Sequence, residues 1–141
     1  MKKIKFPNFI ISNFEVIGWI KLQHKDLYAN IWKEKKLHLI KLSSTPHYNF
    51  FINKDNYNSY HNKYIKHNHV GSMEAINKSI KKKGFDVKFP IFVEELNNSG
   101  KFLIIDGLHR ASVLFKNDKF IDVMILKKKN FISRIISKIF K

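Results

Sequence analysis

Residues 102–115, with the sequence FLIIDGLHRASVLF, constrain the fold more than any other stretch of this chain. An apolar run ends at Asp106 and Gly107, and residues with helical spacing follow at once. This pattern predicts a strand, a tight turn and the first turn of a helix. A helix start carries backbone N–H groups without intrahelical partners and the positive end of the helix dipole, so it favours anions such as phosphate.

His109 and Arg110 add side-chain donors to this predicted helix start. The chain has 25 lysines and only two arginines, so an arginine at this place indicates a need for a planar, two-pronged donor. The alternative is a plain turn in which Asp106 caps the helix and the two side chains face solvent. On the residues alone, the two interpretations carry about equal weight.

The segment Asp106-Gly107-Leu108-His109-Arg110 resembles the Asp-Gly-x-His-Arg motif of the ParB/sulfiredoxin-like superfamily, and most closely that of its free serine kinases. The predicted elements around the motif also follow the superfamily order of helix, strand, strand, helix and strand. They are a helix from Ser72 as its cap to Gly84, a buried strand at 89–95, a turn at 97–100, a strand at 101–105, the motif helix to about Asn117 and a strand at 120–126. The resemblance covers roughly the second half of the chain and implies an α/β (α+β) mixed-sheet domain.

Two other branches of the superfamily fit less well. Sulfiredoxin places its reactive cysteine where Leu108 stands, and this chain has no cysteine, which excludes that chemistry. The chromosome-partitioning ParB proteins carry a Gly-Glu-Arg-Arg motif at the corresponding place and a helix-turn-helix region after it, whereas fifteen residues follow Leu126 here. The kinase branch therefore remains the closest resemblance.

The resemblance to the kinases implies a nucleotide-dependent transfer of phosphate to a hydroxyl of a small metabolite or a sugar precursor, with ATP or ADP and Mg²⁺. It implies phosphate contacts from Gly107, Leu108, His109 and Arg110, where the absence of a side chain at Gly107 lets phosphate approach the backbone. It also implies that Asp106 orients the acceptor hydroxyl or holds the magnesium ion, and that His109 is a catalytic residue beside it.

One departure from the family concerns the proton acceptor. The free serine kinases carry a catalytic glutamate after a Pro-His pair, whereas Tyr48 follows Pro46 and His47 in this chain. The acceptor is then expected among Asp106, His47, Glu94 and Glu95. An unperturbed histidine, with a pKa of about 6.5, suits the task. The alternatives are that His47 and Tyr48 only shape a turn after the strand at 37–42, and that the enzyme has a different substrate or has lost catalysis.

The first half of the chain has weaker signals. Residues 15–22 and 28–42 contain alternating stretches that predict short antiparallel strands with a turn near 24–26. The stretch 47–69 is rich in asparagine, tyrosine and histidine and predicts a polar loop. In the kinase interpretation this loop is a substrate lid, lined by tyrosines at its start and along it. The predicted substrate-lining residues are Tyr48, Tyr57, Tyr60 and Tyr64.

The formal charge of +16 would usually indicate nucleic acid or an anionic membrane as a partner. Most of it comes from lysine, accompanied by abundant isoleucine, phenylalanine and asparagine, a combination that an AT-rich genome produces by mutational bias. Readers of DNA sequence rely on arginine, which is scarce here. Nonspecific affinity for DNA is compatible with the charge. A ParB-like nucleic-acid-binding module is therefore the first alternative to the kinase.

Residues 127–141 combine a basic start with apolar residues at helical spacing, which predicts a basic amphipathic tail. Such a helix can lie on an anionic bilayer, and similar tails are typical of proteins that make bacterial cell-surface polysaccharides. The competing interpretation is that the apolar stripe packs on the domain itself or on a second copy. A noncatalytic nucleotide-binding or membrane-adaptor protein is the second alternative function.

The organisation expected from these patterns is one domain over residues 1–126, followed by the tail. Its core is expected at about 37–126, after a β-rich N-terminal extension at 1–36. A hydrophobic content of 44% suffices for a single core in 141 residues. No apolar run approaches the roughly 20 residues of a membrane span. We expect a cytoplasmic protein, with the tail at the inner face of the membrane.

Overall fold

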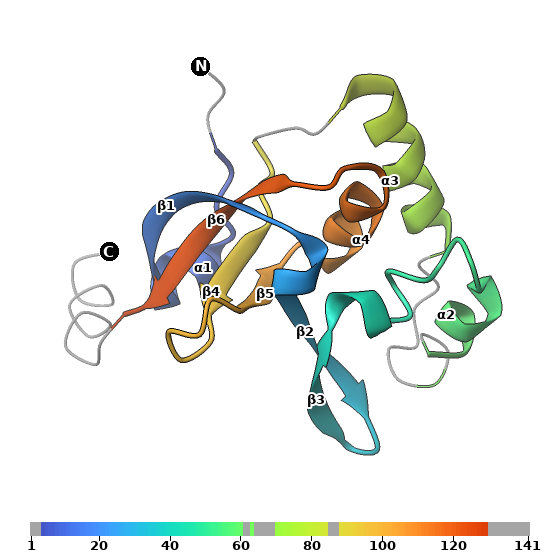
Figure 1. Ribbon diagram of the computed structural model, residues 1–141, viewed down its shortest axis with the longest axis horizontal. Helices are drawn as coiled ribbons and strands as arrows, with labels where there is room; N and C mark the ends of the chain where they lie inside the picture. The colour runs from blue at the N-terminus through green and yellow to red at the C-terminus, as the bar shows by residue number, and fades with distance from the viewer. Residues whose placement is uncertain (1–3, 61–62, 64–69, 85–87, 130–141) are drawn as a thin grey trace.

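The computed structural model describes residues 4–60, 63, 70–84 and 88–129. In this part of the chain, six strands form one mixed sheet, and four α-helices pack around it (Figure 1). The predicted mixture of helices with a mixed sheet is thereby confirmed. The elements in chain order are α1 (Asn8–Asn13), β1 (Phe14–Leu22), the 3₁₀ turn η1 (His24–Asp26), β2 (Leu27–Lys33), β3 (Lys36–Lys41), the 3₁₀ turn η2 (Leu42–Ser44), α2 (Lys54–Tyr60), α3 (Val70–Lys83), β4 (Phe92–Glu95), β5 (Phe102–Asp106), α4 (Leu108–Asn117) and β6 (Ile121–Lys128).

The strands lie in the order β1-β6-β4-β5-β2-β3. The β1–β6, β4–β5 and β2–β3 pairs are antiparallel, and the β6–β4 and β5–β2 pairs are parallel. The predicted turn near 24–26 exists as η1, where the Asp26 carboxylate accepts the Gln23 N–H at 3.1 Å. The strands on either side of it do not pair with each other, because β1 joins β6 at one end of the sheet and β2 joins β5 near the other.

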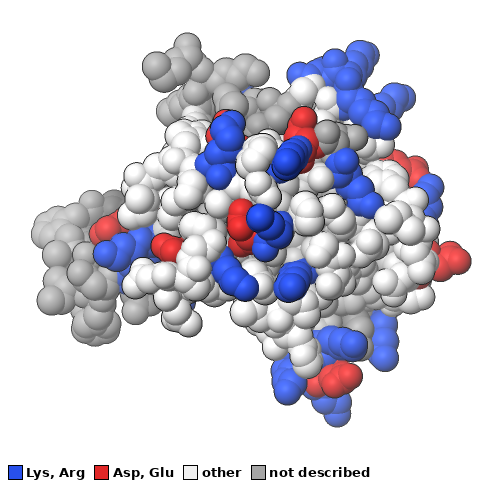
Figure 2. All heavy atoms as spheres, in the orientation of Figure 1, with Lys and Arg blue, Asp and Glu red and all other residues white. Residues whose placement is uncertain are grey.

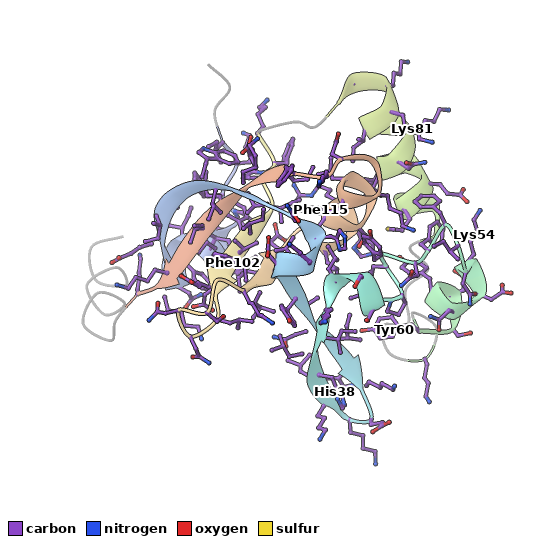
Figure 3. The ribbon with its side chains drawn as sticks, in the orientation of Figure 1. His38, Lys54, Tyr60, Lys81, Phe102 and Phe115 are labelled. Atoms are coloured by element: carbon purple, nitrogen blue, oxygen red, sulfur yellow. The ribbon has the colours of Figure 1, made fainter. Side chains whose placement is uncertain are left out.

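The two faces of the sheet have separate apolar clusters. On one face, side chains of β2, β4, β5 and β6 pack against Ala111, Leu114 and Phe115 of α4. Figure 3 places Phe115 of α4 and Phe102 of β5 in this interior layer. On the other face, Ile10 of α1 covers side chains of β4 and β6. Successive side chains of β6 point to opposite faces of the sheet and therefore contribute to both clusters, as expected for a sheet that is covered on both sides.

A third cluster connects the helices beside the candidate site. Phe50, Tyr57 of α2, Met73 of α3 and Val113 of α4 are fully buried together. α3 extends from Val70, so the predicted cap residue Ser72 lies inside the helix and does not begin it. The predicted end is confirmed at Gly84, whose N–H donates to the Ile80 carbonyl at 2.8 Å with φ +74°.

Several other expectations from the sequence need correction. The predicted strand at 89–95 begins only at Phe92, because the segment before it is irregular. α2 occupies residues 54–60 in the predicted polar loop, and α1 was not predicted. Lys127 and Lys128 belong to β6 and not to a tail helix. The rest of the predicted tail, at 130–141, and Tyr64 lie outside the described residues.

None of the described helices combines the length and the apolar character that crossing a membrane requires.

The two-residue turn between β2 and β3 uses residues that are unfavourable for it. Lys33 pairs with Lys36, and the two residues between them, Glu34 and Lys35, have φ values of +53° and +66°. Positive φ at both central positions is typical of a type I′ hairpin turn, which normally uses Asn-Gly. The double substitution Glu34→Asn and Lys35→Gly is therefore expected to raise the free energy of unfolding by about 1 kcal/mol.

Urea unfolding followed by circular dichroism measures this change. The variant Glu34→Gln and Lys35→Arg keeps the left-handed strain and is the matched control, with a change near zero. A stability for the Asn-Gly variant equal to or below that of the wild type would contradict the assigned turn.

Candidate functional site

Gly107 forms the junction between β5 and α4 in a conformation that suits glycine. Its φ is +103°, and an added Cβ would lie 3.3 Å from the Cα of Ile91 and 3.1 Å from Nη2 of Arg110. The requirement for glycine therefore comes from the backbone angle and from two neighbouring groups of the protein itself. Gly107 is the residue before the helix, and no side chain caps it, so the predicted alternative with Asp106 as the cap is wrong.

The start of α4 presents backbone donors beyond the end of β5. The first intrahelical bond runs from the Ala111 N–H to the Gly107 carbonyl at 2.8 Å. The N–H groups of Leu108, His109 and Arg110 precede that bond, so they are directed beyond the helix start. This is the local arrangement that the sequence predicted for an anion site.

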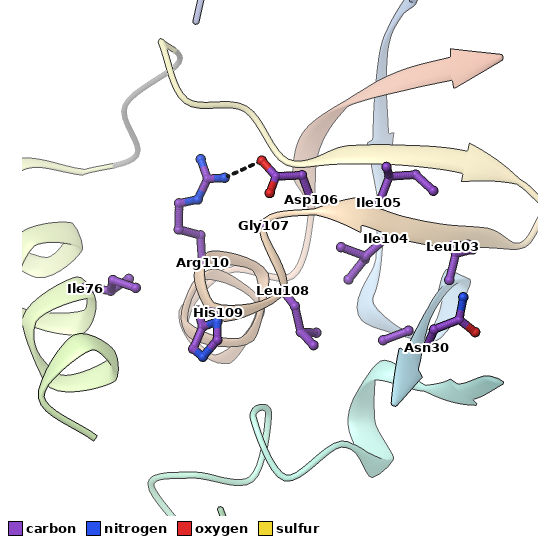
Figure 4. Close-up of a pocket in the computed structure, with 11 residues that line it drawn as sticks. Asn30, Ile76, Leu103, Ile104, Ile105, Asp106, Gly107, Leu108, His109 and Arg110 are labelled. Atoms are coloured by element: carbon purple, nitrogen blue, oxygen red, sulfur yellow. Dashed lines mark hydrogen bonds and ion pairs between the residues drawn. The ribbon is translucent and has the colours of Figure 1, made fainter. Parts of the chain in front are cut away.

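A cavity of about 610 Å³ lies at this junction (Figure 4). It forms where β2 and β5, which are parallel neighbours, pair only at Leu27–Phe102 and Tyr28–Leu103. Ile76 reaches the cavity from α3, and the entire predicted motif contributes to its wall. The lining residues are Ala29, Asn30, Ile76, Leu103, Ile104, Ile105, Asp106, Gly107, Leu108, His109 and Arg110.

Asp106 and Arg110 form an ion pair at the wall of this cavity. Nη2 of Arg110 lies 3.4 Å from Oδ2 of Asp106, and Nη1 of Arg110 donates to the carbonyl of Phe89. Both charged side chains are partly exposed. Burial lowers the pKa of Arg110, and the Asp106 carboxylate acts in the opposite direction. Arginine stays protonated near neutral pH despite such a shift, so the guanidinium of Arg110 keeps its positive charge beside the Asp106 carboxylate.

His109 belongs to a cluster of aromatic and imidazole rings that includes the second predicted catalytic histidine. Its Nε2 lies 3.1 Å from the Tyr57 hydroxyl, and the ring of His47 meets that of His109 edge to face, with centroids 4.9 Å apart. His47 is 4% exposed and also contacts the rings of Tyr57 and Tyr60. Sequence positions 47, 57 and 109 thus meet in space. Of the three, His109 lines the cavity and His47 does not, so the predicted direct role of His47 as proton acceptor does not agree with its position behind His109.

Burial raises the pKa of Tyr57 above its ordinary value, because the phenolate would be desolvated. The hydroxyl therefore stays protonated at neutral pH. In the tautomer of His109 with its proton on Nδ1, this hydroxyl donates to Nε2. The hydrogen bond from Tyr57 to Nε2 thus orients the His109 imidazole, which lines the cavity.

The other predicted residues lie in different surroundings. Tyr48 packs against the main core, with the Lys116 ammonium 4.9 Å from its ring centroid. Tyr60 accepts the Trp32 N–H at 3.2 Å and lines a second cavity, of about 340 Å³, between the β2–β3 hairpin and α2. The Glu95 carboxylate accepts the Gly100 N–H at 2.9 Å, and Oε1 of Glu94 lies 3.9 Å from Nζ of Lys128. Neither glutamate lines the 610 Å³ cavity.

The residues available for a metal ion are few. Among the described residues, no group of three histidine, cysteine or acidic side chains is arranged to hold a metal. Of the described residues that line the cavity, Asp106 is the one with a carboxylate. A magnesium ion at this place would take most of its ligands from phosphate and water, which is usual for Mg²⁺ bound with a nucleotide.

Some wall residues were not predicted from the sequence. Asn30 lines the cavity because β2 lies parallel to β5, and the carbonyl of Phe89 reaches Arg110 because the chain before β4 is not a strand. No local pattern around either residue indicates its position. Asn30 reaches the site through pairing of β2 with a strand about 70 residues later in the chain. The Phe89 carbonyl reaches it through contact with a side chain about 20 residues later.

Comparison of the chain with protein-family models, with curated proteins and with solved structures gives no significant match.

The conformation of Gly107 gives a first prediction for this site. Gly107→Ala is expected to lower the free energy of unfolding by about 3 kcal/mol, from left-handed strain and contact with Ile91 and Arg110. Gly100→Ala is the matched control, because Gly100 has φ +77° with no atom within 4 Å of an added Cβ. That control is expected to cost about 1 kcal/mol. Equal losses in urea unfolding would contradict the close packing around Gly107.

The buried tyrosine gives a second prediction. Tyr57→Phe removes the partner of His109 and is expected to cost about 1–2 kcal/mol at pH 7. The folded pKa of Tyr57 is raised, so its contribution is complete below the unfolded pKa near 10 and is lost as the pH rises through the folded value. The stability difference between wild type and variant should therefore shrink above pH 10.

Urea unfolding at pH 7 and at several alkaline pH values tests this dependence. Tyr28→Phe is the control, because the Tyr28 hydroxyl is exposed and pairs only with the flexible Lys101 side chain among the contacts described. We expect that control to change stability by a few tenths of a kcal/mol. A constant difference between wild type and Tyr57→Phe from pH 7 to 12 would show that the hydroxyl is not buried.

Proposed function

We propose that this chain is a nucleotide-dependent kinase that transfers a phosphoryl group to a hydroxyl of a small metabolite or a sugar precursor. The observation that supports this proposal is that residues 106–110 all line the 610 Å³ cavity. The cavity lies at the carboxyl end of β5, beside the middle of its parallel neighbour β2, and α/β proteins generally bind their ligands at the carboxyl ends of parallel strands.

The start of α4 is the proposed place for the nucleotide phosphates. The N–H groups of Leu108, His109 and Arg110 supply donors, and the Arg110 guanidinium supplies charge and a forked geometry. His109, held through Nε2 by Tyr57, offers its imidazole to the same wall of the cavity. Phosphoryl transfer depends mainly on positioning and on neutralising charge, which such groups provide.

Asp106 is the proposed proton acceptor. The hydroxyl oxygen of the substrate bonds to the phosphorus that is transferred, and the hydroxyl proton passes to the Asp106 carboxylate. At the same time the bond between this phosphorus and the bridging oxygen breaks, and its electron pair leaves on the nucleotide. The Asp106–Arg110 pair, at 3.4 Å and partly exposed, is weak. Phosphate that attracts Arg110 would release the carboxylate for the hydroxyl, so nucleotide binding would prepare the base.

Magnesium is part of this proposal. Asp106 is the residue of the described chain that would contribute to its coordination. The ion supplies neutralisation of the phosphate charges during transfer.

A ParB/sulfiredoxin-like fold is part of the same proposal. The order α3, β4, β5, α4, β6 agrees with the helix, strand, strand, helix, strand order expected from the motif. A cytoplasmic location, where nucleoside triphosphates are abundant, accompanies the kinase activity as an expectation.

A noncatalytic nucleotide-binding protein is the second candidate, and one observation favours it. Tyr48, which stands where the free serine kinases have their catalytic glutamate, packs against the core, and among the described residues Asp106 is the one acid on the cavity wall. Such a protein would bind a nucleotide at the start of α4 without transferring phosphate.

The decisive experiment measures nucleotide binding and turnover together. Mg-ATP at one hundred times its Kd is expected to stabilise the wild type by about 2.7 kcal/mol, raising Tm by about 8 °C. Arg110→Ala is expected to lose this shift because the forked donor is gone. Asp106→Asn is expected to keep most of the shift and to lose transfer of radiolabelled phosphate to a panel of serine, homoserine and sugars.

Controls separate the site from the general charge of the protein. Lys81→Ala removes an exposed positive charge from the end of α3 and should keep the full shift. Arg110→Lys keeps the charge without the fork, and it serves if Arg110→Ala does not fold. A shift without turnover on any acceptor would favour the noncatalytic candidate. Equal, salt-sensitive shifts in wild type and both Arg110 variants would contradict nucleotide binding at this site and favour the nucleic-acid-binding module.

A further inference from the structure

The hairpin formed by β2 and β3 extends away from the rest of the protein (Figure 1). It carries exposed apolar side chains. Trp32 lies directly opposite Leu37, and Leu39 lies opposite Asn30 on the same face of the hairpin. Trp32, Leu37 and Leu39 are 42%, 58% and 51% exposed. These three residues are called the hairpin patch below.

The hairpin patch lies on the same face of the sheet as α1, but α1 covers a different part of that face. Ile10 of α1 and the segment before it pack over Phe92, Met124 and Leu126 of β4 and β6. β2 and β3 are at the other end of the strand order, and among the described residues no helix contributes to a cluster over this part of the face. The patch is therefore open to a partner.

Lysines lie along the hairpin, some of them on the face of the hairpin patch. Lys41, paired with Tyr28, lies on the patch face and Lys35 lies in the turn, whereas Lys33 and Lys36 pair on the opposite face. Lys101, just before β5, adds a charge to the patch face, with its ammonium 5.4 Å from the Tyr28 ring centroid. Figure 2 shows lysine side chains gathered around the end of the hairpin. The charged residues of the hairpin are Lys33, Glu34, Lys35, Lys36 and Lys41, and all are exposed.

We propose that the hairpin patch docks this protein onto an anionic lipid bilayer. Tryptophan and leucine side chains with lysines beside them on the same face and in the turn suit the boundary between headgroups and acyl chains, where the apolar groups leave water and the ammonium groups meet lipid phosphates. Charge complementarity between the lysines and an anionic leaflet selects this occupant. The site is separate from the sequence-predicted tail, and the proposal does not depend on the kinase activity.

Two other occupants fit the observations less well. A stable complex with a second copy buries roughly 800 Å² on each partner, more than three half-exposed side chains provide. The lysines at both ends of the edge strand β3 also oppose strand pairing between copies. Duplex DNA would engage the lysines through its phosphates and would leave the leucines without an apolar partner.

Vesicle binding by the full chain tests the proposal. Wild type is expected to sediment with vesicles of phosphatidylcholine and phosphatidylglycerol at 7:3 and to bind pure phosphatidylcholine at least tenfold more weakly. Leu37→Ser with Leu39→Ser is expected to weaken binding to the anionic vesicles at least tenfold. The matched control is Val16→Ser with Ile17→Ser on β1, which removes two equally exposed apolar side chains at the far edge of the sheet and should leave binding unchanged.

The fluorescence of the two tryptophans shows which end of the sheet enters the bilayer. In Trp19→Phe, the remaining Trp32 is expected to show a blue-shifted emission with anionic vesicles and quenching by brominated lipids. In Trp32→Phe, the remaining Trp19, which is 45% exposed on β1, should show neither.

Three outcomes would overturn the proposal. One is vesicle binding by the Leu37→Ser, Leu39→Ser protein equal to that of wild type, which would assign the contact to another part of the chain. Another is binding with no change in Trp32 emission, which would indicate adsorption through lysines alone. The third is a Trp32 shift with duplex DNA and none with vesicles, which would make the hairpin a nucleic-acid contact. Circular dichroism of each variant verifies that it is folded.

Discussion

The candidate site depends on the early separation of two parallel strands. β5 and β2 are paired at two positions only, after which β2 continues into the projecting hairpin and β5 ends at Asp106. Gly107, at φ +103°, then turns the chain into α4 within one residue. Continued pairing would fill the space with a regular sheet. Because it stops, backbone and side chains of both strands line a hollow that faces the first turn of a helix.

The site is held from two directions. α4 packs into the main core through Ala111, Leu114 and Phe115, which fixes the position of its first turn. From the other side, the cluster of α2, α3 and α4 buries Tyr57, whose hydroxyl meets His109. The groups offered to the cavity therefore rest on packed elements, and the site needs little reordering when a ligand binds.

The local motif was the part of the site that could be predicted. Asp106 to Arg110 fall at a strand end, a left-handed turn and a helix start because each of these has a short-range signature in residue type and spacing. The approach of His47 to His109 has no such signature, since 61 residues lie between them in the chain. The place of Tyr48 after Pro46 and His47 predicts a position near substrate, whereas its ring packs against the core, because adjacency in the sequence does not determine the direction of a side chain.

The sequence alone determined the mixed α+β class, the second-half order of helix, two strands, helix and strand, and the place of the motif at 106–110 between a strand and a helix. These follow from periodicity, glycine and turn residues, which act over a few positions. The tertiary structure decided which strands are neighbours, that β1 pairs with β6 and not with β2, and that Asn30 and the Phe89 carbonyl join the site. Strand partners are chosen by burial of side chains far apart in the chain, and that choice leaves no mark in any local pattern.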